Sequence, residues 1–342
     1  MSVVIGWDVG GAHLKGARAE DGRIVAALQI ASPLWLGVSR LDEAFRAARV
    51  ELGAADSYAA TMTGDLSMAF PSRAEGVAAL AKLIAATLAP GRVRFYAGRA
   101  GFAPPEAVEP HAGDIASANW RASAELVARF CRDALLIDMG STTTDIIPIR
   151  AGLVAARGYS DAERLVSGEL VYAGLVRSLV FASADRAPVN GAWTPLMNDD
   201  FANMADVRRI LGDLPEGADV QATTDGRDKS VSSSRGRLAR MVGRDAREMD
   251  DAAWFGLAQW FAERQLRDIA DAAAQVLSGA RLDSNAPIVA AGFGGEMLRE
   301  LSRRLGRRHV HFGDIVGATP EAREAAAHFA PAAAIAILAS PN

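Results

Sequence analysis

The sequence of 342 residues predicts an α/β protein in which two similar domains enclose a central cleft. Two observations carry this prediction. An apolar run suited to a buried strand ends in Asp138 and a tight Gly-Ser-Thr-Thr turn, and the first strand of the chain ends similarly in Asp8 and two glycines. Strands also alternate with helices, as in partly parallel sheets that helices cover. Because the two acidic turns lie 138 − 8 = 130 residues apart, we interpret them as duplicated hairpins that grip one nucleotide or polyphosphate.

Composition indicates which class of protein this is and which partners are not expected. With 50% hydrophobic and 23% charged residues, the chain is globular and long enough for two domains of roughly 100–200 residues. A net charge of −4 gives no field that attracts nucleic acid or an acidic membrane, so neither is an expected partner. A single cysteine, Cys131, allows no internal disulfide and fits a reducing cytoplasm, where we expect the protein. No secretion signal is recognisable, and the oligomeric state stays open between monomer and homodimer.

The first domain is predicted over residues 1–120. After the first acidic turn, Asp21-Gly22 predicts a second hairpin. Apolar spacing then predicts helices over 41–52 and 74–88, and strands over 58–62 and 93–97. A further helix near 118–132 passes the chain to the second domain.

The second domain, residues 121–342, opens with the same hairpin pattern. Strands are predicted through Ile137, Ile147 and Leu153, and a helix starts near Ser167 and continues through Arg177. Residues 183–250 are rich in Asp, Gly, Ser, Arg and Pro, which indicates an insertion or lid. A long helix over 252–277, a strand over 287–291, a helix through 305 and a strand near 310 follow. The apolar segment 329–339 is shorter than the roughly 20 residues that span a bilayer, so we expect a buried helix that completes this domain.

The two acidic turns supply the candidate site. Asp8 and Asp138 would hold a magnesium ion, mostly through water, because Mg²⁺ keeps much of its hydration shell. Small turn residues would offer N–H and hydroxyl groups to phosphate oxygens; they are Gly10, Gly11, Gly140, Ser141, Thr142 and Thr143. Lys15 would offset charge on a departing diphosphate, although a strand-edge lysine is equally often a solvated charge. We expect Glu169 to act as the general base.

Other candidates are weaker. His13 and Lys15 share one face of a strand, so both can face the cleft, although a packed or surface histidine is also consistent with the sequence. Substrate contacts are expected from His13, Tyr172, Arg177 and Asp225. The loop with Gly292, Gly294 and Gly295 follows a strand, but Met297 replaces the last glycine of a dinucleotide fingerprint. We expect this loop to lie beside an adenosine or similar group.

The motif at residues 138–145 resembles the hydantoinase A/oxoprolinase family, a branch of the actin, sugar kinase and Hsp70 ATPase fold. The whole chain is similar to a narrower branch, the tetrahydromethanopterin-linked C1-transfer pathway proteins. The residues that carry this similarity are 5–15, 61–66, 168–172 with Gly174 and Arg177, 205–207 with Arg209, and 224–227 followed by 237–241. The resemblance implies two ribonuclease H-like domains of the actin-like ATPase fold around a central cleft.

The same resemblance implies an activity. A transferase of methylofuran biosynthesis would join (5-aminomethyl-furan-3-yl)methyl diphosphate to the phenol oxygen of γ-glutamyltyramine or a related acceptor and release pyrophosphate. Members of the wider family usually have Thr and Asp where this chain has Ala12 and Lys15, so ATP-driven ring opening is not the first expectation. An ATP-dependent kinase or amidohydrolase in the same cleft remains the alternative, with a nucleotide sensor and a structural scaffold behind it.

Overall fold

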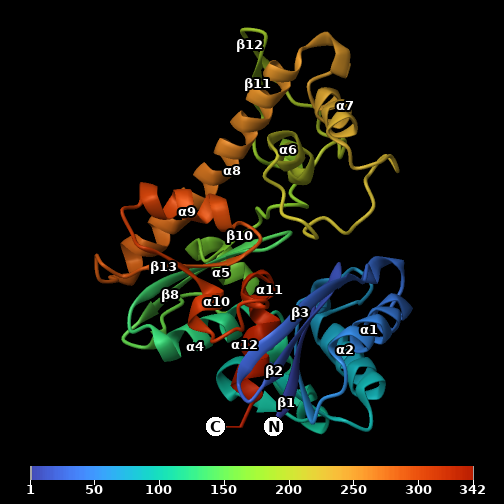
Figure 1. Cartoon of the computed structure of the whole chain (residues 1–342), viewed down its shortest axis with the longest axis vertical. Coiled ribbons are helices and arrows are strands. Elements are labelled where there is room, and N and C mark those ends of the chain that lie inside the picture. The colour runs from blue at the N-terminus through green and yellow to red at the C-terminus, as the bar shows by residue number, and fades with distance from the viewer. Residues whose placement is uncertain (1, 342) are drawn as a thin grey trace.

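The first part of the chain forms a six-stranded sheet, drawn in blue and cyan in Figure 1. The structure is a computed structural model that describes residues 2–341. Strand order is β3-β2-β1-β4-β5-β6, with β1 antiparallel to β2 and parallel to β4. The elements are β1 (Val3–Val9), β2 (His13–Glu20), β3 (Arg23–Ala31), η1 (Leu34–Leu36), α1 (Ser39–Leu52), β4 (Ser57–Met62), η2 (Gly64–Leu66), α2 (Arg73–Leu88), β5 (Arg92–Tyr96), η3 (Gly98–Ala100), β6 (Phe102–Ala103), η4 (Pro105–Ala107), η5 (Glu109–His111) and α3 (Ala112–Ile115).

The second sheet repeats this plan. Its order is β10-β8-β7-β13-β14, with β7 antiparallel to β8 and parallel to β13, so β7 and β8 correspond to β1 and β2. This repetition confirms the predicted α/β fold with two related sheets. The elements are α4 (Asn119–Phe130), β7 (Ala134–Met139), β8 (Thr144–Arg150), β9 (Leu153–Val154), α5 (Asp161–Ser167), β10 (Leu170–Val171), β13 (Ile288–Gly292), α9 (Gly295–Arg304), β14 (His309–His311), α10 (Phe312–Ile315), α11 (Arg323–His328) and α12 (Ala330–Ala339).

The closing helix α12 is buried as expected, but it lies on the first sheet. It packs against β1, β2 and β4, and also against α4 from the second half (Figure 1). Alternate residues of β1 explain this: Ile5 and Trp7 face α1 and α2, while Val4 belongs to the core that α12 shares with the second sheet. One continuous apolar core therefore joins the two halves. No helix within residues 2–341 is long and apolar enough to cross a bilayer.

The predicted insertion is a subdomain with its own core. Its elements are η6 (Val180–Ala182), β11 (Arg186–Val189), β12 (Ala192–Pro195), α6 (Met204–Leu211), α7 (Val231–Met241) and η7 (Ala246–Glu248). They pack on the first half of the long helix α8 (Asp251–Ala280), whose Trp254, Leu257 and Phe261 are buried there. Figure 1 shows α8 rising from the second sheet to the insertion. The insertion is therefore tethered to the sheet by a rigid element as well as by loops.

The predicted helix from Ser167 through Arg177 is wrong. A helix precedes this segment instead: α5 starts at a capping box of Ser160 and Glu163 and ends at Gly168, which is left-handed with φ of 78°. A glycine in this conformation ends helices because other residues are strained there. Leu170 and Val171 then pair with β8 as an edge strand, and the following residues form turns around the second acidic turn.

Candidate active site between the two acidic turns

The two acidic turns have matching geometry. Asp8 pairs in register with Lys15, and Asp138 pairs with Asp145, each seven positions later. Within the turns, the N–H of Gly10 donates to the carbonyl of His13 at 2.9 Å, and the N–H of Gly140 donates to that of Thr143 at 2.9 Å. Both turns line one cavity of about 530 Å³. The structure therefore brings the two predicted hairpins together, and it places Lys15 and Asp145 at equivalent positions.

Lys15 is the cation at the centre of the cluster. Its ammonium lies 3.1 Å from Oδ2 of Asp8, whose side chain is 1% exposed. Burial acts to lower the pKa of Lys15, but the negative charges of Asp8, Asp138 and Asp145 outweigh it, and the pKa is raised. The ammonium is therefore protonated; the Lys15 side chain is 20% exposed and lines the cavity. Oδ1 of Asp8 is buried without a hydrogen-bond partner among residues 2–341.

Asp145 has a cation of its own. Its carboxylate accepts a hydrogen bond from Arg164, whose guanidinium lies 4.3 Å from the centre of the Trp120 ring and is almost fully buried. Neither Asp145 nor Arg164 is among the site residues predicted from the sequence. The hairpin register was the available signal for Asp145, because a residue seven positions after Asp138 lies directly opposite it.

Within residues 2–341, Asp138 forms no salt bridge, unlike Asp8 and Asp145. Its pKa is raised to about 8, chiefly by burial and also by the negative charges of Asp145 and Asp8, with Lys15 partly opposing the rise. At neutral pH this carboxyl group is therefore largely protonated, and it can donate a hydrogen bond into the cavity. Glycine at position 292 makes room for it, since a side chain there would lie within 2.7 Å of Oδ1 of Asp138.

We expect Asp138→Asn to change how stability depends on pH. In the folded wild type, this carboxyl holds its proton up to a pKa of about 8, whereas the unfolded chain releases it near the ordinary value of 3.8. The free energy of unfolding of wild type therefore falls as the pH rises from 3.8 to about 8, by at most about 1.4 kcal/mol per pH unit. Asparagine is neutral throughout. Between pH 5 and pH 8, the free energy of unfolding measured with urea should fall by a few kcal/mol more in wild type than in the variant. An equal fall in both proteins would contradict the raised pKa.

The residues present do not fit a magnesium ion held by the protein. Mg²⁺ requires about six oxygen ligands in octahedral geometry. The ammonium of Lys15 already lies 3.1 Å from Oδ2 of Asp8, where the metal ion would have to bind. Among residues 2–341, no group of three or more His, Cys, Asp or Glu side chains could hold a metal ion. We therefore treat any Mg²⁺ as a companion of a diphosphate substrate and assign it no ligand in the protein.

Several polar groups in the cavity lack a partner. Nε2 of His13 and Oγ of Ser141 are buried and make no hydrogen bond within the described part of the chain. In the same range, the backbone N–H groups of Gly11 and Thr142 donate to no protein acceptor. Buried polar groups in folded proteins are nearly always paired. This cavity therefore suits a ligand rich in hydrogen-bond acceptors.

His13 is neutral in this environment. Burial, together with the positive charges of Lys15 and Arg177, lowers its pKa to about 3. A neutral imidazole has one nitrogen that accepts a proton or hydrogen bond. The structure thus places His13 in the cavity, as the strand parity predicts, and in the protonation state of a base.

The mouth of the cavity is aromatic and apolar. Trp35 is 50% exposed, Tyr172 62% and Met68 97%, and all three line the cavity. The guanidinium of Arg177 lies 5.2 Å from the centre of the Trp35 ring, a cation–π contact. Tyr172 and Arg177 are thus at the predicted site, whereas Trp35 was missed because a lone exposed Trp in a short 3-10 helix carries no sequence pattern.

The second turn is held by the segment that follows β10. The N–H groups of Val176 and Arg177 donate to the carbonyl of Ser141 at 3.1 and 2.8 Å. Gly174 lies so close to the backbone of Thr142 that any side chain would overlap it. The packing explains why a glycine is needed there, and it fixes Arg177 beside the turn.

Two predicted site residues lie elsewhere. Glu169 is 1% exposed, and its carboxylate accepts hydrogen bonds from the N–H groups of Arg157 and Gly158 and from Ser167 at 2.6 to 2.7 Å. With its oxygens occupied and outside the cavity, Glu169 fixes a loop and is not placed to act as a base. Asp225 pairs with Arg237 at 3.1 Å in the insertion and does not line the main cavity.

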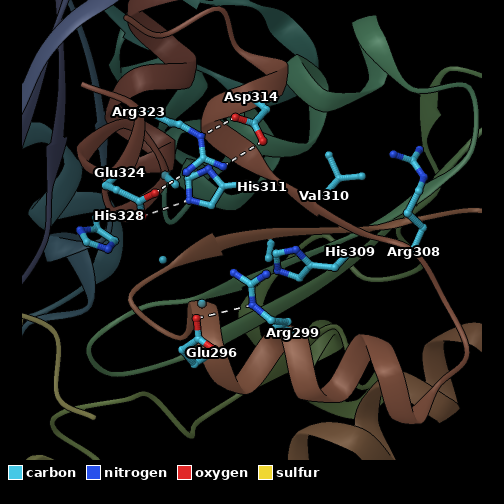
Figure 2. Close-up of a pocket in the computed structure, with 14 residues that line it drawn as sticks. Glu296, Arg299, Arg308, His309, Val310, His311, Asp314, Arg323, Glu324 and His328 are labelled. Carbon is cyan, nitrogen blue, oxygen red and sulfur yellow. Dashed lines mark hydrogen bonds and ion pairs between the residues drawn. The ribbon is translucent and has the colours of Figure 1, made fainter. Parts of the chain in front are cut away.

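The glycine loop after β13 borders a second cavity. Gly292 and Gly295 line it, while Gly294 packs against Met139. Figure 2 shows Arg299 and Glu296 on one side and the group Asp314, Arg323 and Glu324 on the other. Arg323 forms ion pairs with Asp314 and Glu324. His328 lines both cavities, and Phe293, whose ring centre lies 4.6 Å from that of His328, lines the main cavity. The predicted adenosine contact of this loop stays a prediction.

An ionic bridge crosses between the two halves beside the cavity. Arg73, at the start of α2, contacts Asp65 at 3.0 Å and Asp161 of α5 at 3.1 Å. Asp161 in turn lies 3.6 Å from Arg164, the partner of Asp145. The bridge therefore connects the segment after β4 to Asp161 and Arg164, which line the cavity beside the second acidic turn.

Comparisons with known proteins agree with this architecture. The repeated sheets and paired acidic turns define a protein of the actin-like ATPase fold. A nucleotide-free structure of acetone carboxylase, from work on ATP-dependent acetone carboxylation, aligns with a TM-score of 0.58 and 11% identity, over 97% of this chain and 70% of that chain. Residues 56–318 match the hydantoinase/oxoprolinase family. The chain belongs to this family.

Two curated relatives carry the same name, (4-{4-[2-(gamma-L-glutamylamino)ethyl]phenoxymethyl}furan-2-yl)methanamine synthase. The protein from Methanocaldococcus jannaschii is 30% identical over 300 residues, which cover 87% of this chain and 88% of the relative. The protein from Methanococcus vannielii is 31% identical over 118 residues, covering 34% of this chain and 53% of the relative. Both relatives are enzymes by name, and the predicted narrower family is confirmed.

Proposed function

We propose that this protein is a transferase that builds an aryl furfuryl ether of the methylofuran type. The donor would be (5-aminomethyl-furan-3-yl)methyl diphosphate, and the acceptor the phenol of γ-glutamyltyramine or a related tyrosine-derived compound. The observation that carries the proposal is the protonated Lys15 in a cavity with a polar floor and an aromatic mouth. The shared name of the two relatives supports the choice of substrates.

The floor of the cavity suits the leaving group. In the reaction, the bond between the furfuryl carbon and the diphosphate oxygen breaks, and its electron pair leaves with pyrophosphate. Negative charge therefore grows on the bridging oxygen, where Lys15 and the protonated carboxyl of Asp138 would stabilise it. The N–H groups of Gly11 and Thr142 would hold the remaining phosphate oxygens.

The phenol needs a proton acceptor as its oxygen forms the new bond to carbon. Nε2 of His13 is unpartnered and faces no competing donor among the described residues, so we assign the phenol proton to it. After burial, the positive charges of Lys15 and Arg177 are the next causes of the low pKa of His13, and a bound diphosphate would offset both charges. The donor would thus make His13 a stronger base at the moment the acceptor reacts.

The aromatic mouth suits the two rings. Trp35, Tyr172 and Met68 offer exposed apolar surface on which a furan and a phenol can stack. A cavity of about 530 Å³ is within the usual range for small-molecule sites, roughly 300–1,000 Å³. ATP fits the fold class as well, and a kinase or amidohydrolase reaction is the competing outcome of the experiment below.

The proposal is tested by mass spectrometry of the products from the furfuryl diphosphate and γ-glutamyltyramine, with and without Mg²⁺. We expect an ether with the mass of both organic parts, one pyrophosphate per ether, and no need for ATP. Parallel reactions with ATP and each acceptor are followed for ADP. ADP formation without an ether would show an ATP-dependent enzyme instead of the transferase. If neither ADP nor an ether is formed, the activity named for the relatives is not an activity of this protein.

A further inference from the structure

A side chamber opens next to the main cavity. Its volume is about 390 Å³, and it shares Trp35 and Arg177 with the main cavity. One wall is the segment around Trp35 from the first half of the chain, and the other comes from the insertion, at Asp200, Asn203, Asp219 and residues 221–224. The Trp35–Arg177 stack therefore lies where the two spaces meet.

The chamber is built into the closed molecule. Nε2 of Gln221 in the insertion donates to the carbonyl of Ala12 at 2.8 Å, and Nε2 of Gln29 donates to the carbonyl of Gly217 at 2.6 Å. These bonds join the insertion directly to the first acidic turn and to β3. The chamber wall is thus held at a fixed position relative to the turn that carries His13 and Lys15.

The floor of the chamber has no unbalanced charge. Arg209 lies 3.2 Å from Asp206 and 2.6 Å from Asp219, and Arg237 lies 2.8 Å from Asp206. Asp206, Arg209 and Arg237 are largely buried and hold one another in place. Such a network is rigid and already satisfied, so a ligand gains little by binding to it.

Two charges in the lining are unpaired. Within residues 2–341, Arg177 and Asp200 make no salt bridge, unlike the other charged side chains of the chamber. Arg177 is partly buried on the Trp35 ring, and a guanidinium removed from water favours a carboxylate partner. Asp200 is exposed at the insertion side and is free to accept hydrogen bonds. One free cation and one free anion in one chamber match a zwitterion.

We propose that this chamber binds the α-amino acid head group of the acceptor, with its carboxylate at Arg177 and its ammonium at Asp200. The phenol end of the same molecule would pass Trp35 into the main cavity and reach His13. The inference rests on the proposed function for the identity of the acceptor. It adds a recognition site that distinguishes a glutamyl-bearing phenol from a simple phenol.

The test compares two acceptors in two variants. γ-Glutamyltyramine carries the head group, and N-acetyltyramine is a phenol without it. Asp200→Asn should raise KM for γ-glutamyltyramine about tenfold, because one charged hydrogen bond is lost. KM for N-acetyltyramine should stay unchanged. Asp199→Asn is the matched control, since the neighbouring aspartate does not line the chamber and asparagine keeps the oxygen that accepts from the N–H of Asp200. Equal effects on both acceptors, or no effect in Asp200→Asn, overturn the chamber assignment.

Calorimetry separates this inference from the proposed reaction. γ-Glutamyltyramine is titrated into wild type and both variants without any diphosphate. A dissociation constant that rises about tenfold only in Asp200→Asn supports the chamber even if no ether is formed. Equal constants, or no binding to wild type, overturn it, even if ether formation succeeds.

Discussion

Replacing Lys15 with methionine should lower kcat by about a thousandfold, the larger end of what one charge-stabilising donor contributes. The ammonium is the cation nearest the Asp8 carboxylate, and it faces the cavity where the leaving diphosphate would gain charge. Methionine keeps the length of the side chain and removes only the charge and the donors. Steady-state release of pyrophosphate from the furfuryl diphosphate and a phenolic acceptor measures the effect.

The stability of the variant needs its own control. Asp8 is 1% exposed, so the single variant leaves a buried carboxylate without its cation, which costs about 3–5 kcal/mol in comparable cases. The double variant Lys15→Met with Asp8→Asn removes both charges and should fold better. Lys82→Met, on the exposed face of α2, controls for loss of a lysine elsewhere. A folded double variant with wild-type kcat would show that Lys15 has no role in catalysis.

His13→Gln should lower kcat by about a hundredfold, the low end for loss of a general base. Glutamine retains a hydrogen-bonding side chain of similar reach but cannot take a proton. The comparison is His111→Gln, since His111 lies outside the main cavity. A kcat in His13→Gln equal to that of His111→Gln would remove His13 from the reaction.

The pH profile gives an independent check on His13. A base acts only when unprotonated, and burial together with Lys15 and Arg177 lowers the pKa of His13 to about 3 in the free protein. The kcat/KM of wild type, which reports the free enzyme, should therefore show no loss from His13 between pH 8 and pH 5. A histidine at its ordinary pKa of 6.5 would instead lose activity tenfold per pH unit below that value.

The central cleft was predictable because its signal is local. An apolar strand that ends in an aspartate and a small turn defines its own geometry, and the chain contains two such strands, at Asp8 and Asp138. The chemistry of the cluster was less accessible. Only the register shows that Lys15 faces Asp8, and that the ammonium therefore takes the place where the sequence suggested a metal ion.

The errors come from contacts between distant segments. Glu169 was predicted as the carboxylate that takes the phenol proton, yet its oxygens accept hydrogen bonds from the N–H groups of Arg157 and Gly158. The residues after Gly168 have helical spacing, but pairing with β8 and packing on the second turn decide their structure. The apolar sequence of α12 predicts burial but does not indicate which of the two sheets the helix covers. The boundary near residue 120 stays a proposal, since the halves share one core.

The most direct measurement is a crystal structure of the protein soaked with Mg²⁺ and pyrophosphate. We expect pyrophosphate between the two acidic turns, with oxygens within hydrogen-bonding distance of Lys15 and of the N–H groups of Gly11 and Thr142. Any visible Mg²⁺ should lie on the phosphates. Pyrophosphate bound in the cavity around Arg299 and Arg308 instead, with the turns empty, would contradict it.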